Sequence, residues 1–277
     1  MSILTQLDFW IVLLSGVCFG SFASALVWRV PRGISWIFPS KSDRHTDEGQ
    51  ETVRSRCPSC GHILSVRDLV PVLSWVFLRG KCRFCKKTIS FIYPLMELLS
   101  FAAVVALYVV YGLSPLFVVT VLTVPFLVAL LFIDIRYYIL PNQLVLVLAL
   151  LGIGYHGLLW WFDPQVNTGV LLYYGMSGVV YGLISWATGF LMSLVLRKQS
   201  LGFGDVKFFA VAGLWLGLNY LPYFMIVSGV IGILWALPAV LKGKKGRFPF
   251  GPALILSFFF GILLKGVGFV PFLSGFS

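Results

Sequence analysis

The chain has 277 residues, of which 59% are hydrophobic and only 11% are charged, and its mean hydropathy is +0.94. Soluble globular domains carry about 25% charged residues, so this composition excludes an ordinary soluble domain. Apolar runs long enough to cross a bilayer recur along the whole sequence. The composition therefore predicts an all-α polytopic membrane protein.

Eight apolar segments are candidates for transmembrane helices. The sixth is short and reaches a useful length only if its helix extends back through Asp205, so seven spans plus one re-entrant piece is the alternative. The first segment is long and lacks the basic start of a signal peptide, so we expect a retained anchor. The segments are approximately Phe9–Val30, Ile89–Tyr111, Pro115–Ile133, Leu144–Phe162, Val170–Leu196, Val206–Leu218, Leu221–Leu241 and Pro249–Val270.

Basic residues are distributed unevenly along the chain, which has a net charge of +11. Of 21 Lys and Arg residues, 12 lie between Arg29 and Lys87. Others follow the third, fifth and seventh segments, whereas the loops after the second, fourth and sixth carry none. This alternation predicts that the odd-numbered loops are cytoplasmic and that both termini are periplasmic. The charge thus indicates topology and attraction to anionic lipid headgroups, not nucleic-acid binding.

Two acidic residues lie at the margins of apolar segments. Asp134 closes the third segment, and Asp205 stands in the stretch Gly202-Phe203-Gly204-Asp205 before the sixth. Asp205 could simply cap its own helix, but the helix dipole disfavours an anion at the C-terminal position of Asp134. The predicted topology brings both acids to the cytoplasmic side, although 71 residues separate them. Gly202 and Gly204 would allow another backbone to approach closely.

A third acid, Glu97, lies about nine residues into the second apolar segment. An unpaired carboxylate is costly at that depth in a membrane. The sequence leaves two states open, a protonated Glu97 or an ion pair between Glu97 and Lys207.

The loop between the first two segments, residues 31–88, is the only sizeable polar region. It contains two Cys-x-x-Cys turns with 21 residues between them, which match a four-thiolate zinc ribbon. The reducing cytosol argues against disulfides, and unmetallated turns or a redox dithiol are the alternatives. An apolar stretch between the turns, Asp68–Trp75, is expected to pack on the metal site or the membrane face. The predicted ligands of a structural Zn²⁺ are Cys57, Cys60, Cys82 and Cys85.

The predicted organisation is thus a first transmembrane helix over residues 1–30, a zinc-ribbon-like insert over residues 31–88, and a membrane core over residues 89–277. Two carboxylates held close together share a proton, so one can activate water while the other polarises a peptide carbonyl. This is aspartic-protease chemistry. A proton-coupled transporter and a non-catalytic pilus or secretion assembly platform are the alternatives. Placement of both acids at one face argues against a proton path across the bilayer.

Seven short motifs cover nearly the whole chain: Gly20-Ser21-Phe22, Trp28–Arg32, the paired Cys-x-x-Cys turns with Asp68–Trp75, Tyr93–Leu98, Ile133-Asp134 with Leu140–Asn142, Gly202–Lys207, and Phe250-Gly251-Pro252. Together they resemble the prepilin peptidases, or type 4 prepilin leader peptidases/N-methyltransferases. These belong to the GxGD intramembrane aspartic proteases.

The resemblance implies that Asp134 and Asp205 are the catalytic pair. It implies a multi-pass enzyme of the bacterial inner membrane that cuts type IV prepilins or type II secretion pseudopilins at the cytoplasmic face. It further implies N-methylation of the new N-terminus with S-adenosylmethionine. The expected partners are these substrates and membrane lipids, with no nucleic acid. Gly202, Gly204, Lys207 and Glu97 are expected to support the site.

The chain departs from the family pattern at two positions near the first acid. Arg136 stands where many members have a second acid, and Asn142 stands where many have Asp. Neither change removes the expected pair, but both alter the charge around Asp134. The polar loop also lacks a glycine-rich nucleotide-binding motif, so methylation rests on the resemblance alone.

Overall fold

The computed structural model describes residues 3–34, 36, 57, 59–65, 72–197, 201–241 and 248–269. The polar stretch Lys41–Glu51, the segment Asp68–Pro71 and the basic residues Lys198 and Lys242–Arg247 lie outside the described residues. Within the described part the fold is helical without a named strand, and Lys81 and Thr88 form an isolated antiparallel bridge. The predicted all-α class is confirmed.

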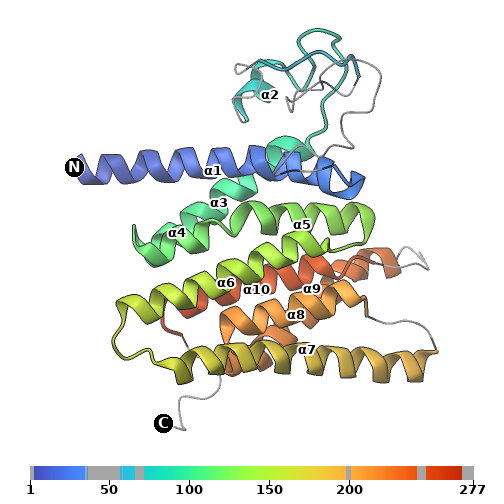
Figure 1. Cartoon of the computed structure of the whole chain (residues 1–277). Coiled ribbons are helices and arrows are strands. Elements are labelled where there is room, and N and C mark those ends of the chain that lie inside the picture. Colours follow the sequence, from blue (N-terminus) through green and yellow to red (C-terminus); the bar gives the residue numbers. More distant parts are fainter. Residues whose placement is uncertain are drawn as a thin grey trace. The chain divides into compact units, whose positions relative to one another are not determined.

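Apart from the short α2 in the polar loop, the helices lie over the eight apolar segments of the sequence, and Figure 1 shows their order. Six candidate membrane spans are long and apolar enough to cross a bilayer, and α8 and α10 are shorter, with 14 and 16 residues. The short sixth segment does extend back through Asp205, because α8 begins at Phe203. The bounds are α1 Ile3–Arg29, α2 Leu73–Phe77, α3 Ile92–Tyr111, α4 Pro115–Val121, α5 Val124–Tyr137, α6 Asn142–Phe162, α7 Thr168–Leu196, α8 Phe203–Leu216, α9 Leu221–Leu241 and α10 Gly251–Gly266.

The third span consists of two helices, α4 and α5, joined by a tight turn. Ser114 caps α4, because its hydroxyl oxygen accepts the N–H of Phe117 at 3.1 Å. The turn lies just before Pro125, which has no backbone N–H to continue the hydrogen bonding of the preceding helix. Thr123 instead donates its hydroxyl to the carbonyl of Thr120 at 2.6 Å. The hydroxyl and the backbone N–H of Thr123 thus both bond to the carbonyl of Thr120 where the span is interrupted.

The chain divides into two compact units, Met1–Ala106 and Leu107–Ser277, and each is described by itself. In the first unit, α1 packs closely against α3 through two glycines one turn apart. A Cβ added at Gly16 would lie 2.9 Å from the Cα of Phe101, and one at Gly20 would lie 2.5 Å from the Cα of Glu97. Small residues at this spacing let two membrane helices approach closely. The order of the contacts makes α1 and α3 antiparallel.

The second unit is built around α8, which packs against α6, α7 and α10. Figure 1 shows α8 alongside the long α7. The α7–α8 contact is close, because a Cβ at Gly213 would lie 2.5 Å from the carbonyl oxygen of Ser177. Phe208 and Trp215 of α8 are buried. This packing fixes the position of the helix whose first turn carries Asp205.

The far end of α8 meets a cluster of polar and aromatic side chains. The Lys265 ammonium donates to the carbonyl oxygen of Trp215 at 2.6 Å and lies 4.1 Å from the ring centroid of Tyr174. His156 stacks on the same tyrosine, and its Nε2 lies 2.9 Å from the carbonyl oxygen of Leu214. A carbonyl can only accept, so Nε2 carries the proton. These contacts stabilise a cation that would be costly in lipid.

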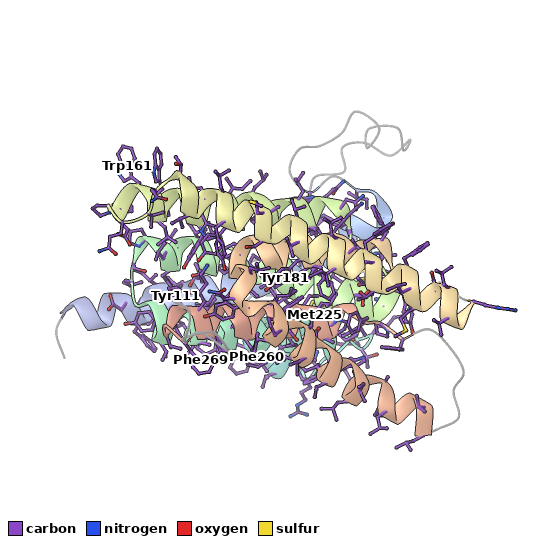
Figure 2. All side chains as sticks on the ribbon, turned by 90° about the horizontal axis from the view of Figure 1, so that it is seen from below. Tyr111, Trp161, Tyr181, Met225, Phe260 and Phe269 are labelled. Carbon is purple, nitrogen blue, oxygen red and sulfur yellow. The ribbon has the colours of Figure 1, made fainter. Side chains whose placement is uncertain are left out.

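Aromatic residues of the second unit divide between its interior and its surface. Tyr181 is fully buried and donates its hydroxyl to the carbonyl oxygen of Gly217 at 3.0 Å. Trp161 at the end of α6 is 78% exposed, and Figure 2 shows it pointing outward. Exposed aromatic residues near the end of a span are typical of the membrane–water interface.

Candidate active site and metal cluster

Asp134 lies in the last turn of α5 and is buried. Its Oδ2 accepts the backbone N–H of Gly251, the first residue of α10, at 2.9 Å. The carboxylate at the unfavourable end of its own helix is therefore placed at the favourable, N-terminal end of another helix. This contact explains how a carboxylate is stabilised at position 134, which capping of α5 cannot explain.

Gly251 is needed for this contact. A Cβ at that position would lie 2.6 Å from the Oδ2 and 2.7 Å from the Cγ of Asp134. No side chain can occupy this space while the carboxylate keeps its position. The glycine of the Phe250-Gly251-Pro252 motif thus serves the site directly.

Asp205 lies in the first turn of α8 and is partly exposed. Its Oδ2 accepts the backbone N–H of Gly202 at 3.2 Å, so it does cap its own helix. The capping function expected of an acid at this position is therefore present.

The turn between α5 and α6 connects the end of α5, which carries Asp134, to the start of α8, which carries Asp205. Tyr138 ends α5 in the left-handed conformation with φ of 57°. Leu140 then packs against α8, where a Cβ at Gly204 would lie 3.2 Å from the Leu140 Cβ. Lys207 donates to the Oδ1 of Asn142 at 2.8 Å. Two contacts thus join the end of α5 and the start of α6 to the first two turns of α8, and both acids lie at one end of the unit.

The supporting residues have separate partners. Lys207 bonds to Asn142 and lies 4.7 Å from the ring centroid of Phe203. Glu97, in the first unit, accepts the backbone N–H of Val72 at 2.6 Å. Arg136 is exposed and lies over the ring of its neighbour Tyr137. Since Asn142 is neutral, the charge of Lys207 is not cancelled by this partner.

The four cysteines of the polar loop form one cluster. Their sulfur atoms all lie within 4.8 Å of one another, and the Sγ atoms of Cys57 and Cys85 are 3.9 Å apart. A tetrahedral zinc with Zn–S bonds of about 2.3 Å would hold its sulfurs about 3.8 Å apart. The side chains therefore fit a bound metal ion such as zinc.

The two Cys-x-x-Cys turns have the same backbone pattern. The N–H of Gly61 donates to the carbonyl of Cys57 at 2.9 Å, and the N–H of Lys86 donates to the carbonyl of Cys82 at 3.0 Å. Both donors have a positive φ, 69° for Gly61 and 60° for Lys86. Each turn therefore aims two sulfurs at one point, as a four-thiolate site requires.

The thiols of the first turn differ in acidity. Hydrogen bonding from the backbone of Ser59 lowers the pKa of Cys57 to about 7, against a smaller effect of burial. The pKa of Cys60 is raised to about 11, because burial and the neighbouring thiols Cys57 and Cys85 together outweigh the hydrogen bond from His62. Thiolates are the metal-binding form of cysteine. One sulfur of the cluster is thus readily ionised near neutral pH.

We expect about one zinc ion per chain in the purified protein, since four thiolates complete a closed site. Elemental analysis measures this directly. The double variant Cys57→Ser/Cys60→Ser should lose the metal, and Cys18→Ser, which changes a cysteine of α1 outside the cluster, should retain it. Equal zinc content in both variants would contradict the assignment of the ligands.

Comparison with known proteins places the chain among membrane peptidases. Residues 14–111 match the bacterial Peptidase A24 N-terminal domain, and residues 121–237 match the type IV leader peptidase family. A prepilin leader peptidase/N-methyltransferase of Aeromonas salmonicida (strain A449) is 32% identical over 94% of this chain and 92% of its own length. The enzyme of that name from Neisseria gonorrhoeae is 33% identical over 93% and 91%.

A third relative, which has a different name, also processes leader peptides according to that name. The type 4 prepilin-like proteins leader peptide-processing enzyme of Escherichia coli O78:H11 (strain H10407 / ETEC) is 30% identical over 87% of this chain and 88% of its own length. No solved structure matches the chain. The class is thus a multi-pass membrane peptidase. Within that class, the chain belongs to the type IV leader peptidase family, and the expected family membership is confirmed.

Proposed function

We propose that this protein is an aspartic endopeptidase that removes the leader peptide of type IV prepilins or type II secretion pseudopilins. One observation carries the proposal: Asp134 and Asp205 lie at the same end of the second unit, although the sequence separates their helices, because Leu140 and Asn142 join the end of α5 and the start of α6 to the start of α8. The names of the relatives, which describe leader-peptide processing of prepilins, support the substrate class.

The proposed chemistry needs only the two carboxyl groups and water. One ionised carboxylate takes a proton from water as the oxygen attacks the scissile carbonyl carbon, while the other, protonated, donates a hydrogen bond to the carbonyl oxygen. Collapse of the tetrahedral intermediate breaks the C–N bond, and a carboxyl proton passes to the leaving nitrogen. The pair ends with one proton, as it began. Asp134 and Asp205 exchange the two functions during the cycle.

The position of the pair suits a substrate that is half in the membrane. Both acids lie at helix ends, and we propose that these ends face the cytoplasmic side of a bacterial inner membrane, with both termini periplasmic. The alternation of basic and uncharged loops supports this orientation. A prepilin has a cytosolic leader followed by an apolar helix, so its scissile bond would lie at this depth. We assign the chemistry to residues 89–277 and structural zinc binding to residues 31–88.

We further propose that the new N-terminus is methylated with S-adenosylmethionine as the methyl donor. Support comes from the names of the relatives, which include an N-methyltransferase activity. Zinc bound by the four cysteines would stabilise the fold of the loop and would take no part in cleavage.

A cleavage assay on a membrane-inserted prepilin tests the proposal. Purified protein in lipid vesicles should release the leader, and mass analysis of the product should identify the new N-terminus and any added methyl group. An intact prepilin after incubation with folded, zinc-containing protein would reject the peptidase proposal. Proton or solute transport by the same vesicles without cleavage would favour the transporter instead.

A further inference from the structure

The short helix α2, Leu73–Phe77, presents an apolar face to its surroundings. Leu73, Val76 and Phe77 are 54%, 55% and 81% exposed. Trp75 points the other way: its indole N–H donates to the carbonyl of Ile89 at 3.1 Å. Trp75 thus fixes one side of α2 to the residues that precede α3. The other side, with Leu73, Val76 and Phe77, is exposed.

Two contacts place α2 beside the beginning of a membrane span. The N–H of Val72, which precedes α2, donates to the Oε2 of Glu97 at 2.6 Å. Glu97 is the sixth residue of α3, so this anchor lies about 7.5 Å along the helix from its first residue. Trp75 also contacts the ring of Phe91, immediately before α3, with centroids 5.7 Å apart. α3 is a candidate span by length and composition, and both contacts join α2 and the residue before it to the first two turns of α3 or to the residue before it.

The segment between α2 and α3 is strongly basic. Between Val72 and Met96, where every residue is described, no acidic side chain occurs. The cationic side chains of this segment are all exposed: Arg79, Lys81, Arg83, Lys86 and Lys87. An exposed apolar face beside a cluster of cations is the pattern of segments that lie in the interface of an anionic membrane.

We propose that α2 and these five cations form an interfacial patch that binds anionic phospholipid headgroups of the leaflet entered by α3. Leu73, Val76 and Phe77 insert at the boundary between headgroups and acyl chains, and the cations contact the phosphates. The patch holds the cysteine cluster against the membrane surface. The proposal uses only contacts within the first unit and is independent of the chemistry at the two aspartates.

Photocrosslinking with the full-length protein tests which molecule covers the patch. A benzophenone amino acid at position 77 in vesicles of phosphatidylcholine and phosphatidylglycerol should form adducts with phospholipid, identified by mass analysis. Crosslinks only to a second copy of the chain, or only to an added prepilin, would overturn the proposal. Absence of any lipid adduct in folded, zinc-containing protein would do so as well.

Amide hydrogen exchange tests the charge requirement. Exchange in Leu73–Phe77 should be severalfold slower in vesicles with phosphatidylglycerol than in phosphatidylcholine alone. Lys81→Gln/Lys87→Gln should reduce this difference, whereas the matched control Arg136→Gln/Arg197→Gln, which removes two exposed cations elsewhere, should leave it unchanged. Identical exchange in both lipids for the unmodified protein would reject headgroup binding. Zinc content shows whether each variant keeps its fold.

Discussion

Asp134→Asn and Asp205→Asn should each lower the rate of leader cleavage by roughly 10³-fold or more, because general acid–base catalysis contributes about 10²–10⁴-fold and either loss removes one half of the pair. Both variants should remain folded. An amide oxygen at position 134 can still accept the N–H of Gly251, and one at position 205 can still accept the N–H of Gly202. The measurement is the cleavage rate of a membrane-inserted prepilin at equal amounts of inserted enzyme.

Asp163 supplies the control for these two variants. It lies at the end of α6, is exposed, and accepts the N–H of Gln165 at 2.9 Å. Asp163→Asn makes the same chemical change away from the pair and should cleave at the rate of the unmodified protein. Normal cleavage by either Asp134→Asn or Asp205→Asn would remove the catalytic assignment of that residue.

Gly251→Ala should lower cleavage by roughly 10²-fold, because the added methyl group would lie 2.6 Å from the Oδ2 of Asp134 and must displace the carboxylate. Crowding in this buried contact should also destabilise the protein by about 1–3 kcal/mol. Cleavage assays and thermal unfolding in the same detergent separate the two effects. The loss of activity should exceed what the unfolded fraction explains.

The matched control is Gly229→Ala in α9, where an added Cβ would meet no atom within 4 Å. Alanine is the better helix former by about 1 kcal/mol, so this variant should be as stable as the unmodified protein or slightly more stable. It should also cleave normally. A Gly251→Ala variant with full activity would show that Asp134 does not need its observed position.

The sequence predicted what depends on local composition. Apolar runs located the helices, and spacing identified the four cysteines. The placement of Asp134 and Asp205 on the cytoplasmic side, made from the basic loops, stays a prediction. The sequence left open whether the sixth segment is a span that extends back through Asp205 or a re-entrant piece; α8 does begin at Phe203, but it has only 14 residues. Apolar segments and cysteine spacing are patterns among residues close together in the sequence. A single sequence can therefore reveal them.

The contacts that join distant segments left no such signal. The hydrogen bond from Gly251 to Asp134 connects residues 117 positions apart, and Lys207 bonds to Asn142 across 65 positions. The sequence left open whether Glu97 pairs with Lys207, and the structure gives each a different partner. The Glu97 contact with Val72 depends on how the loop folds back on α3. Such pairs follow from tertiary packing, and no single-sequence pattern encodes them.

The bond between Asp134 and Gly251 has a consequence for biosynthesis. A ribosome makes α5 and α8 well before α10, so the nascent chain holds both acids in the membrane while Asp134 still lacks its backbone donor. Only α10, whose first residue is Gly251, supplies that donor. On the proposed mechanism, a nascent chain that lacks α10 lacks the Asp134 contact on which cleavage depends. Chains arrested after α9 should insert without acquiring it.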